Sequence, residues 1–177
     1  MTAPVHGLNV PAHVLVTGAS SGIGLAMVDG LLENPSVSRV FAVSRRAMGS
    51  EVFTTLRARH GERLQPISAD LTTDAGLDTI VAGIRAHCDD LHLVVNCAGL
   101  LHGDGLRPEK SLATLDRDAL ERSFALNAFA PVLLVRALLP LLAPDAPRVV
   151  ASLSARVGSI GDNRLGGDDW DDRVVEH

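Results

Sequence analysis

The sequence contains no tyrosine, one lysine, one tryptophan and two cysteines among its 177 residues. Without tyrosine no phenol is available to donate or accept a proton, so one common acid–base group of enzymes is missing. The two cysteines, Cys88 and Cys97, are too few for a disulfide framework. We expect Cys97 to be a small buried side chain rather than a reactive thiol.

Targeting and metal-binding patterns are missing as well. No apolar run of about 18 residues is free of polar breaks, so we expect no membrane-spanning helix. The N-terminus lacks a basic segment followed by an apolar run, and we therefore expect no signal peptide and a cytoplasmic location. A net charge of −5 gives no support for nucleic-acid or membrane partners. The seven histidines lack zinc-site spacing, so the sequence predicts no metal site.

Short apolar runs alternate with helical patterns along the chain, which predicts an α/β fold with a parallel sheet. Pro131 should kink or interrupt the last helix. Residues 168–177 are acidic and without a period, so we expect a disordered tail after a single domain over residues 1–167. The predicted strands are 14–16, 39–43, 64–68, 91–95 and 148–152, and the predicted helices are 22–32, 50–60, 74–87 and 116–142.

A glycine-rich turn joins the first predicted strand to the first helix. It reads Thr-Gly-Ala-Ser-Ser-Gly-Ile-Gly over residues 17–24. Glycine permits a tight turn there and lets backbone N–H groups at the helix N-terminus approach a phosphate. Together with the predicted strand before it and the predicted helix after it, the turn predicts a nucleotide site, in which we place Gly18, Ser20, Ser21, Gly22, Ile23 and Gly24.

This segment resembles the cofactor fingerprint of the short-chain dehydrogenase/reductase family. Three further motifs follow in the family's order: Asp70-Leu71, Asn96-Cys97-Ala98-Gly99 and Asn127. The resemblance implies a Rossmann-type doubly wound sheet of about five strands, incomplete at its C-terminal end. It adds Asp70, Leu71, Asn96, Ala98 and Gly99 to the cofactor site. Residues 106–110 and 154–160 are similar to the C-factor-like carbonyl reductase subgroup.

The end of the second predicted strand bears on cofactor choice. An acid there would hold the ribose of NAD, whereas a nearby arginine accommodates the 2′-phosphate of NADP. The acid is absent, and Arg45 and Arg46 follow Ser44. We therefore predict NADP rather than NAD, with two solvated surface arginines as the alternative.

The resemblance also implies hydride transfer to or from a small carbonyl or alcohol substrate. Asn127 and Ser154 match the family's catalytic asparagine and serine, although Ala155 and Ser159 are alternatives for the serine position. The Tyr-x-x-x-Lys motif is absent, since Lys110 has no tyrosine near it. We interpret this as a truncation or frameshift that leaves the chain inactive.

A second hypothesis is a non-catalytic dinucleotide-binding remnant or a regulatory partner. In either case we expect a homo-oligomer through the long predicted helix or the last strand's exposed edge.

Overall fold

Five parallel strands form the single sheet of the described residues in this computed structural model, which describes residues 11–101, 112–142 and 148–154. The strands are β1 (Ala12–Thr17), β2 (Val37–Ser44), β3 (Leu64–Ser68), β4 (Leu93–Asn96) and β5 (Val149–Ser152). Their order is β3-β2-β1-β4-β5, and each neighbouring pair is parallel. This is the strand order of a dinucleotide-binding fold, so the predicted Rossmann-type class is confirmed.

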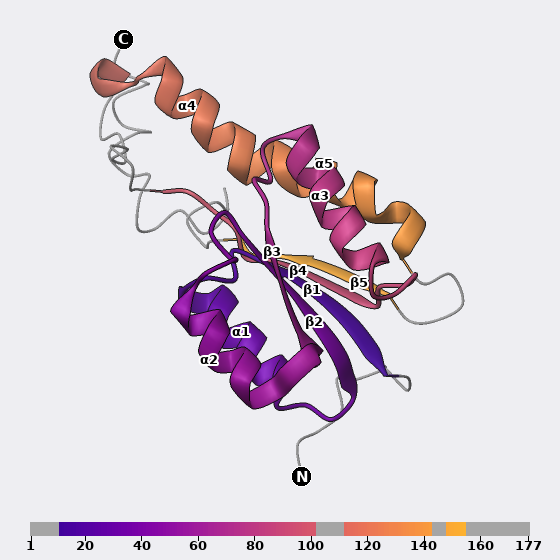
Figure 1. Cartoon of the computed structure of the whole chain (residues 1–177). Helices are drawn as coiled ribbons and strands as arrows, with labels where there is room; N and C mark the ends of the chain where they lie inside the picture. The colour runs from indigo at the N-terminus through magenta and orange to yellow at the C-terminus, as the bar shows by residue number, and fades with distance from the viewer. Residues whose placement is uncertain (1–10, 102–111, 143–147, 155–177) are drawn as a thin grey trace.

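Helices cover both faces of the sheet (Figure 1). α1 (Gly22–Leu32) and α2 (Glu51–His60) lie on one face, while α3 (Asp74–Arg85) and a long helix lie on the other. Side chains alternate along the central strand β1: Val14 and Val16 join the first core cluster and Leu15 joins the second. Period-two alternation in a strand buried on both faces thus builds two apolar layers.

The long helix contains a π-helical turn. It consists of α4 (Arg117–Phe124), the π turn η3 (Ala125–Phe129), α5 (Ala130–Leu138) and the 3-10 turn η4 (Leu139–Leu141). Pro131 lies in the first turn of α5 and has no N–H, so the carbonyl of Asn127 lacks its usual i+4 donor. The sequence correctly predicted a local disturbance at Pro131, and the structure places it in the turn just before.

One helix of the described residues bears on the expectation that no helix spans a membrane, which stays a prediction. The continuous helix Arg117–Leu141 is long and apolar enough to cross a membrane by length and composition alone. Only 22% of its most apolar window is buried. Ala130, Leu134 and Leu138 pack into the second core cluster, so one side of this helix covers the sheet.

Several predicted boundaries also need correction. β1 and β2 extend beyond 14–16 and 39–43, and β4 begins at Leu93 rather than at residue 91. The reason is that the Leu91 N–H donates to the Leu141 carbonyl at 2.6 Å, outside the sheet ladder. α3 ends at Arg85, two residues earlier than predicted. Two short 3-10 turns that the sequence did not predict are η1 (Gly61–Arg63), before β3, and η2 (Leu112–Thr114), before α4.

The last described strand, β5, lies at an edge of the sheet and all four of its residues are exposed. The predicted edge position is therefore confirmed for the described residues. The tail at 168–177 lies outside them.

Candidate functional site

A cavity of about 890 Å³ opens where the strands end at their carboxyl termini. This is the usual ligand position in an open α/β sheet. Its lining includes eleven of the predicted cofactor-binding residues, and it reaches from the glycine turn to α4. These eleven are Gly18, Ser20, Ser21, Gly22, Ile23, Gly24, Arg45, Asp70, Leu71, Ala98 and Gly99.

Glycine is required at two positions of the turn. Gly18 has φ +64°, and a Cβ there would lie 2.7 Å from the backbone nitrogen of Ala98. A Cβ on Gly24 would collide with the carbonyl of Gly18. The turn and the first part of α1 therefore pack backbone against backbone, which no larger residue permits.

The N-terminus of α1 is prepared for an anion. Ser21 is its N-cap but makes no side-chain cap bond, and no acidic residue lies in the first turn. The first N–H groups of a helix have no intrahelical partner and carry partial positive charge. A phosphate at this end of the cavity would satisfy them.

The end of β2 supplies a second group for a ligand. Ser44 is 8% exposed and lines the cavity, and its hydroxyl is buried without a hydrogen-bond partner within the described residues. Arg45 follows it and also lines the cavity, whereas Arg46 is exposed and outside the lining. Of the two predicted arginines, the structure therefore brings only Arg45 to the site.

Asp70 is held as a carboxylate beside the cavity. Its Oδ1 accepts hydrogen bonds from the Thr72 hydroxyl at 2.7 Å and the Thr72 N–H at 2.9 Å. These bonds, the hydroxyl first, and the charge of Arg45 lower the pKa of Asp70 below its ordinary 3.8. Leu71 also lines the cavity, but it is 7% exposed and belongs mainly to the core.

Asn96 supports the site from beneath. It is 5% exposed and absent from the lining, and its Oδ1 accepts a hydrogen bond from the buried Thr17 hydroxyl. The same hydroxyl accepts from the Ala98 N–H at 3.3 Å. Thr17 and Asn96 thus join the ends of β1 and β4 and fix the turn that Ala98 and Gly99 expose to the cavity.

Asn127 is a positioning residue in the described structure. Its Oδ1 accepts from the Leu100 N–H at 2.8 Å, and its Nδ2 donates to the Leu100 carbonyl at 2.7 Å. The side chain therefore ties the π turn to the segment after β4. Its own main-chain carbonyl remains without an i+4 donor because of Pro131.

Ser154 is exposed just beyond β5 and is not part of the lining, although its neighbour Leu153 is. The Leu153 N–H donates to the Asn96 carbonyl at 2.9 Å, which holds this end of β5 against β4. The alternatives Ala155 and Ser159 lie outside the described residues, as does Lys110.

Sequence reasoning missed several lining residues. Ser44 was read only as the place of a missing acid, and Arg122, Leu126 and Leu153 were not considered at all. Arg122 comes from α4, in a stretch where Asn127 was the only site residue considered, and the fold brings its side chain to the cavity. Ser44 could have been found, since it directly precedes Arg45 at the end of an apolar strand.

The described lining offers no evident proton donor for a carbonyl. Its titratable members are Arg45, Asp70, Cys97 and Arg122. Burial raises the pKa of the Cys97 thiol, and the pKa of Asp70 is lowered, so neither is tuned for proton exchange near neutral pH.

Comparison with known sequences places these features in context. A sequence model described as short chain dehydrogenase matches residues 12–161. The short-chain dehydrogenase RED3 of Pyricularia oryzae is 34% identical over 155 residues, covering 83% of this chain and 58% of that protein. The rhamnolipids biosynthesis 3-oxoacyl-[acyl-carrier-protein] reductase of Pseudomonas aeruginosa is 33% identical over 147 residues, with 83% and 53% covered.

Solved structures agree with the sequence matches. A carbonyl reductase from Pseudomonas aeruginosa in complex with NADP superposes with a TM-score of 0.74 at 31% identity, over 86% of this chain and 65% of that one. An NADPH-bound carbonyl reductase from chicken fatty liver gives a TM-score of 0.75 at 26% identity, over 90% and 63%. The chain spans about half the length of the curated relatives it matches.

Proposed function

The chain belongs to the short-chain dehydrogenase family, and on that premise we propose that its cavity binds NADP in preference to NAD. The observation that carries the proposal is the end of β2. Ser44 offers a buried hydroxyl without a partner in the described structure, and Arg45 follows on the same cavity wall. A carboxylate at this point would repel a 2′-phosphate, whereas a guanidinium and a hydroxyl both donate hydrogen bonds to it.

The glycine turn would hold the remaining phosphates. The N-terminus of α1, which has no side-chain cap, lines the cavity, and the space beside Gly22 is open and leaves room for a pyrophosphate. The adenine end would lie toward Asp70, whose carboxylate is fixed by Thr72. When bound, the nicotinamide of this cofactor supplies hydride transfer to or from a carbonyl carbon.

We propose a small carbonyl or alcohol as the substrate class, in line with the carbonyl reductases among the structural neighbours. The contribution of Asn127 is to position the Leu100 segment. Because these 177 residues contain no tyrosine, and because the described lining lacks a suitable acid, we propose that they reduce carbonyls very slowly by themselves. The alternative role is non-catalytic: a dinucleotide-binding protein or a regulatory partner of a relative.

Two measurements test these proposals. Titration of the purified chain with NADPH and NADH, followed by the fluorescence of the bound nicotinamide, should give tighter binding of NADPH. Equal affinities, or a preference for NADH, would contradict the proposed cofactor. An assay of NADPH oxidation over a panel of aldehydes and ketones should show negligible turnover. Robust turnover would contradict the proposal that these residues reduce carbonyls very slowly, and it would require a proton donor other than the residues of the described lining.

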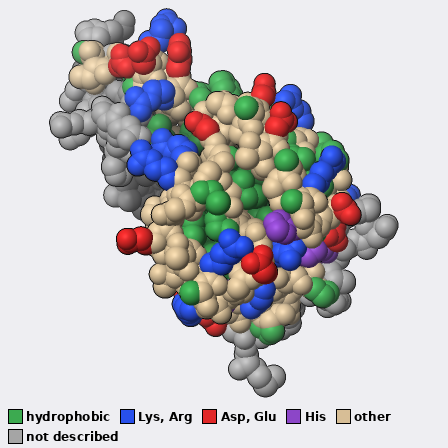
Figure 2. All heavy atoms as spheres, viewed as in Figure 1, with side chains coloured by type: hydrophobic (Ala, Val, Ile, Leu, Met, Phe, Trp, Pro, Cys, Tyr) green, Lys and Arg blue, Asp and Glu red, His purple; other side chains and the backbone are tan. Residues whose placement is uncertain are grey.

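A second copy of this chain is the partner we propose. Phe124, Phe129, Val132 and Leu139 are each more than half exposed along the long helix. Phe124 and Phe129 contact one another across the π turn, with ring centroids 6.4 Å apart, so the apolar stripe continues through it. Hydrophobic side chains reach the surface over this helix (Figure 2).

The charges on the long helix favour an antiparallel pairing of two copies. Glu121 lies toward the start of the helix and Arg136 toward its end, and both are exposed. Antiparallel pairing of two such helices would place the carboxylate of one copy near the guanidinium of the other. Burial of the apolar stripe would supply the main favourable term.

A further inference from the structure

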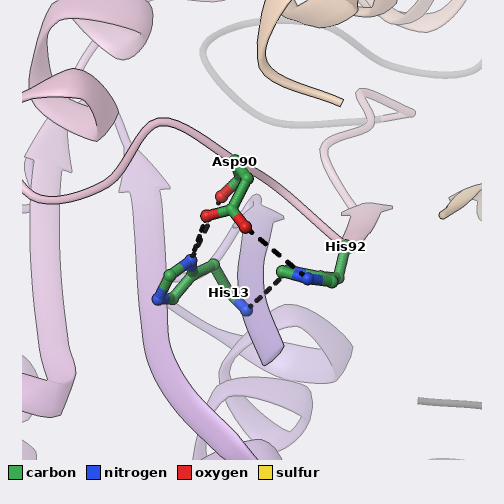
Figure 3. A group of neighbouring side chains, drawn as sticks. All are labelled: His13, Asp90 and His92. Carbon is green, nitrogen blue, oxygen red and sulfur yellow. Dashed lines mark hydrogen bonds and ion pairs between the residues drawn. The ribbon is translucent and has the colours of Figure 1, made fainter. Parts of the chain in front are cut away.

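Three polar side chains meet at the amino ends of the neighbouring strands β1 and β4. The cofactor cavity lies at the opposite, carboxyl ends of the strands. His13 Nδ1 lies 2.8 Å from Asp90 Oδ1, and His92 Nε2 lies 3.7 Å from Asp90 Oδ2. One ligand atom from each residue lies within 4.8 Å of the other two. The Asp90 carboxylate stands between the two imidazole rings, with one oxygen directed at each (Figure 3).

The hydrogen bonds of the cluster fix where its protons are. His92 Nδ1 accepts from the His13 N–H at 3.3 Å, so a neutral His92 carries its proton on Nε2, which faces Asp90. The 3.7 Å separation from Oδ2 is too long for a hydrogen bond. The His92 side chain is only 4% exposed, and its Nε2 lies beside a carboxylate oxygen that it does not reach.

We propose that His13, Asp90 and His92 bind a divalent transition metal such as Zn²⁺, through His13 Nδ1, an Asp90 oxygen and His92 Nε2. Two imidazoles and a carboxylate suit zinc and its neighbours, whereas Mg²⁺ and Ca²⁺ prefer oxygen ligands. Tetrahedral ligands at about 2.1 Å from zinc stand about 3.4 Å apart. The observed separations of 2.8 and 3.7 Å lie on either side of that value.

To bring all three ligand atoms to one ion, the side chain that must move most is Asp90. Asp90 is 45% exposed and lies in the connection between α3 and β4, so its carboxylate can rotate toward a shared ion. His13 is 22% exposed, and its ring can carry its proton on Nε2 once Nδ1 is a ligand. Water would complete the coordination on the exposed side.

The cost of binding falls on His92. If Nε2 becomes a ligand, the proton of the neutral ring moves to Nδ1, and the bond from the His13 N–H is lost. The start of β1 can absorb this change, because its pairing with β2 is already irregular between Ala12 and His13. We therefore expect moderate rather than tight affinity for the ion.

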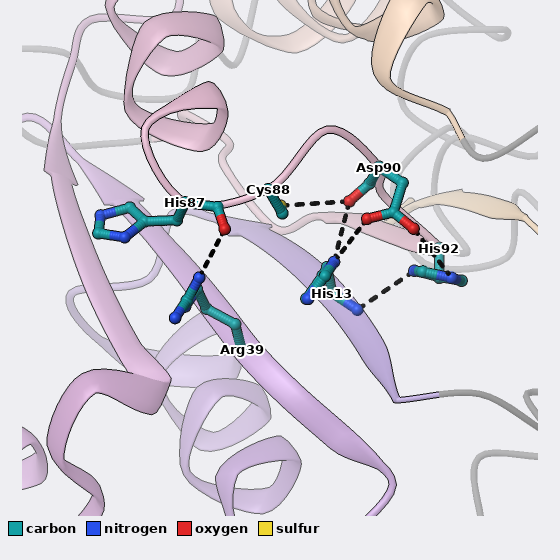
Figure 4. A network of polar contacts seen from close by, with 6 residues as sticks. All are labelled: His13, Arg39, His87, Cys88, Asp90 and His92. Atoms are coloured by element: carbon teal, nitrogen blue, oxygen red, sulfur yellow. Dashed lines mark hydrogen bonds and ion pairs between the residues drawn. The ribbon is translucent and has the colours of Figure 1, made fainter.

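The surroundings of the cluster favour the three-residue ligand set. The Cys88 thiol donates to the Asp90 carbonyl at 3.3 Å (Figure 4). Its sulfur is not part of the group of ligand atoms that lie within 4.8 Å of one another, so we leave Cys88 out of the ligand set. Arg39 donates to the His87 carbonyl at 2.9 Å, so the connection that carries Asp90 is also held to β2.

Sequence spacing could not show this site. His13 is 77 residues from Asp90 and 79 from His92, and only the β1–β4 pairing brings them together. The expectation of no metal site rested on local motifs alone. A bound ion would link β1 to the α3–β4 connection, so its role would be structural rather than catalytic.

The test is a calorimetric titration of the EDTA-treated full chain with Zn²⁺ at pH 7.5. One equivalent should bind, and Asp90→Asn or His92→Gln should each weaken binding by about tenfold or more. The matched control His87→Gln, at an exposed histidine nearby, should leave the affinity unchanged. No binding to the wild type, or equal binding to all variants, would overturn the proposal.

Two further readouts keep a misfolded variant from confusing the result. Each variant should retain its circular dichroism spectrum and its NADPH affinity, because the cofactor cavity lies at the opposite ends of the strands. Co²⁺ used as a probe should give visible ligand-field bands without a thiolate charge-transfer band. A thiolate band that disappears in Cys88→Ser would contradict the assigned ligands.

Discussion

Replacing Arg45 by alanine should selectively weaken the binding of NADPH. Arg45 lines the cavity next to the buried Ser44 hydroxyl, so its loss removes a charged donor to the 2′-phosphate. A hydrogen bond to a charged group contributes about 1.5–3 kcal/mol, and exposure of Arg45 places the effect at the lower end. Since about 1.4 kcal/mol is tenfold in affinity, we expect roughly a tenfold loss.

Arg46→Ala is the matched control, because Arg46 is the exposed neighbour outside the cavity lining. Its NADPH affinity should change by less than about twofold at moderate salt, where exposed charges are largely screened. NADH affinity should be the same in both variants, measured by the same fluorescence titration. Equal losses in the two variants, or a loss in Arg45→Ala that is the same for NADH, would refute the reasoning.

Three further outcomes follow from the geometry. Because the pKa of Asp70 is lowered on folding, its carboxylate stabilises the fold above about pH 4, and this contribution is lost as the pH falls through the folded pKa. Thr72→Val should raise the pKa of Asp70 in an NMR titration, whereas the control Thr79→Val on α3 should leave it unchanged. Asn127→Ala removes two hydrogen bonds to Leu100 and should lower the free energy of unfolding by about 1–2 kcal/mol in urea denaturation, while an unchanged value would contradict the positioning role. Val132→Glu should convert the proposed dimer to a monomer in light scattering, whereas Val52→Glu on α2 should leave it intact; a wild-type monomer would count against the pairing.

Much of the fold could be predicted because local patterns specify it. Apolar runs such as Val14–Val16 and residues 39–43 gave the strands, and their alternation with helices gave a parallel sheet. The boundaries were less predictable, because they depend on contacts made elsewhere. Leu91, for example, continues the apolar run but bonds to Leu141 instead of joining β4.

The candidate site was predictable where a backbone shape is required. Gly18 and Gly24 are needed because any Cβ would collide with the backbone, so their spacing carries information in the sequence itself. Arg122 and the orphaned hydroxyl of Ser44 depend on which surfaces face the cavity, and this becomes visible only after folding. Arg45 and Arg46 look alike in the sequence, yet only Arg45 lines the site.

NADP binding in the cavity at the glycine turn can be located residue by residue by NMR of the ¹⁵N-labelled chain during titration with NADPH. We expect the largest amide shift changes at residues 18–24, 44–45 and 70–72. The amide shifts around His13 and His92, at the amino ends of β1 and β4, should remain unchanged. Shift changes concentrated around these two residues, or no shift changes in the glycine turn at saturation, would contradict NADP binding in the cavity.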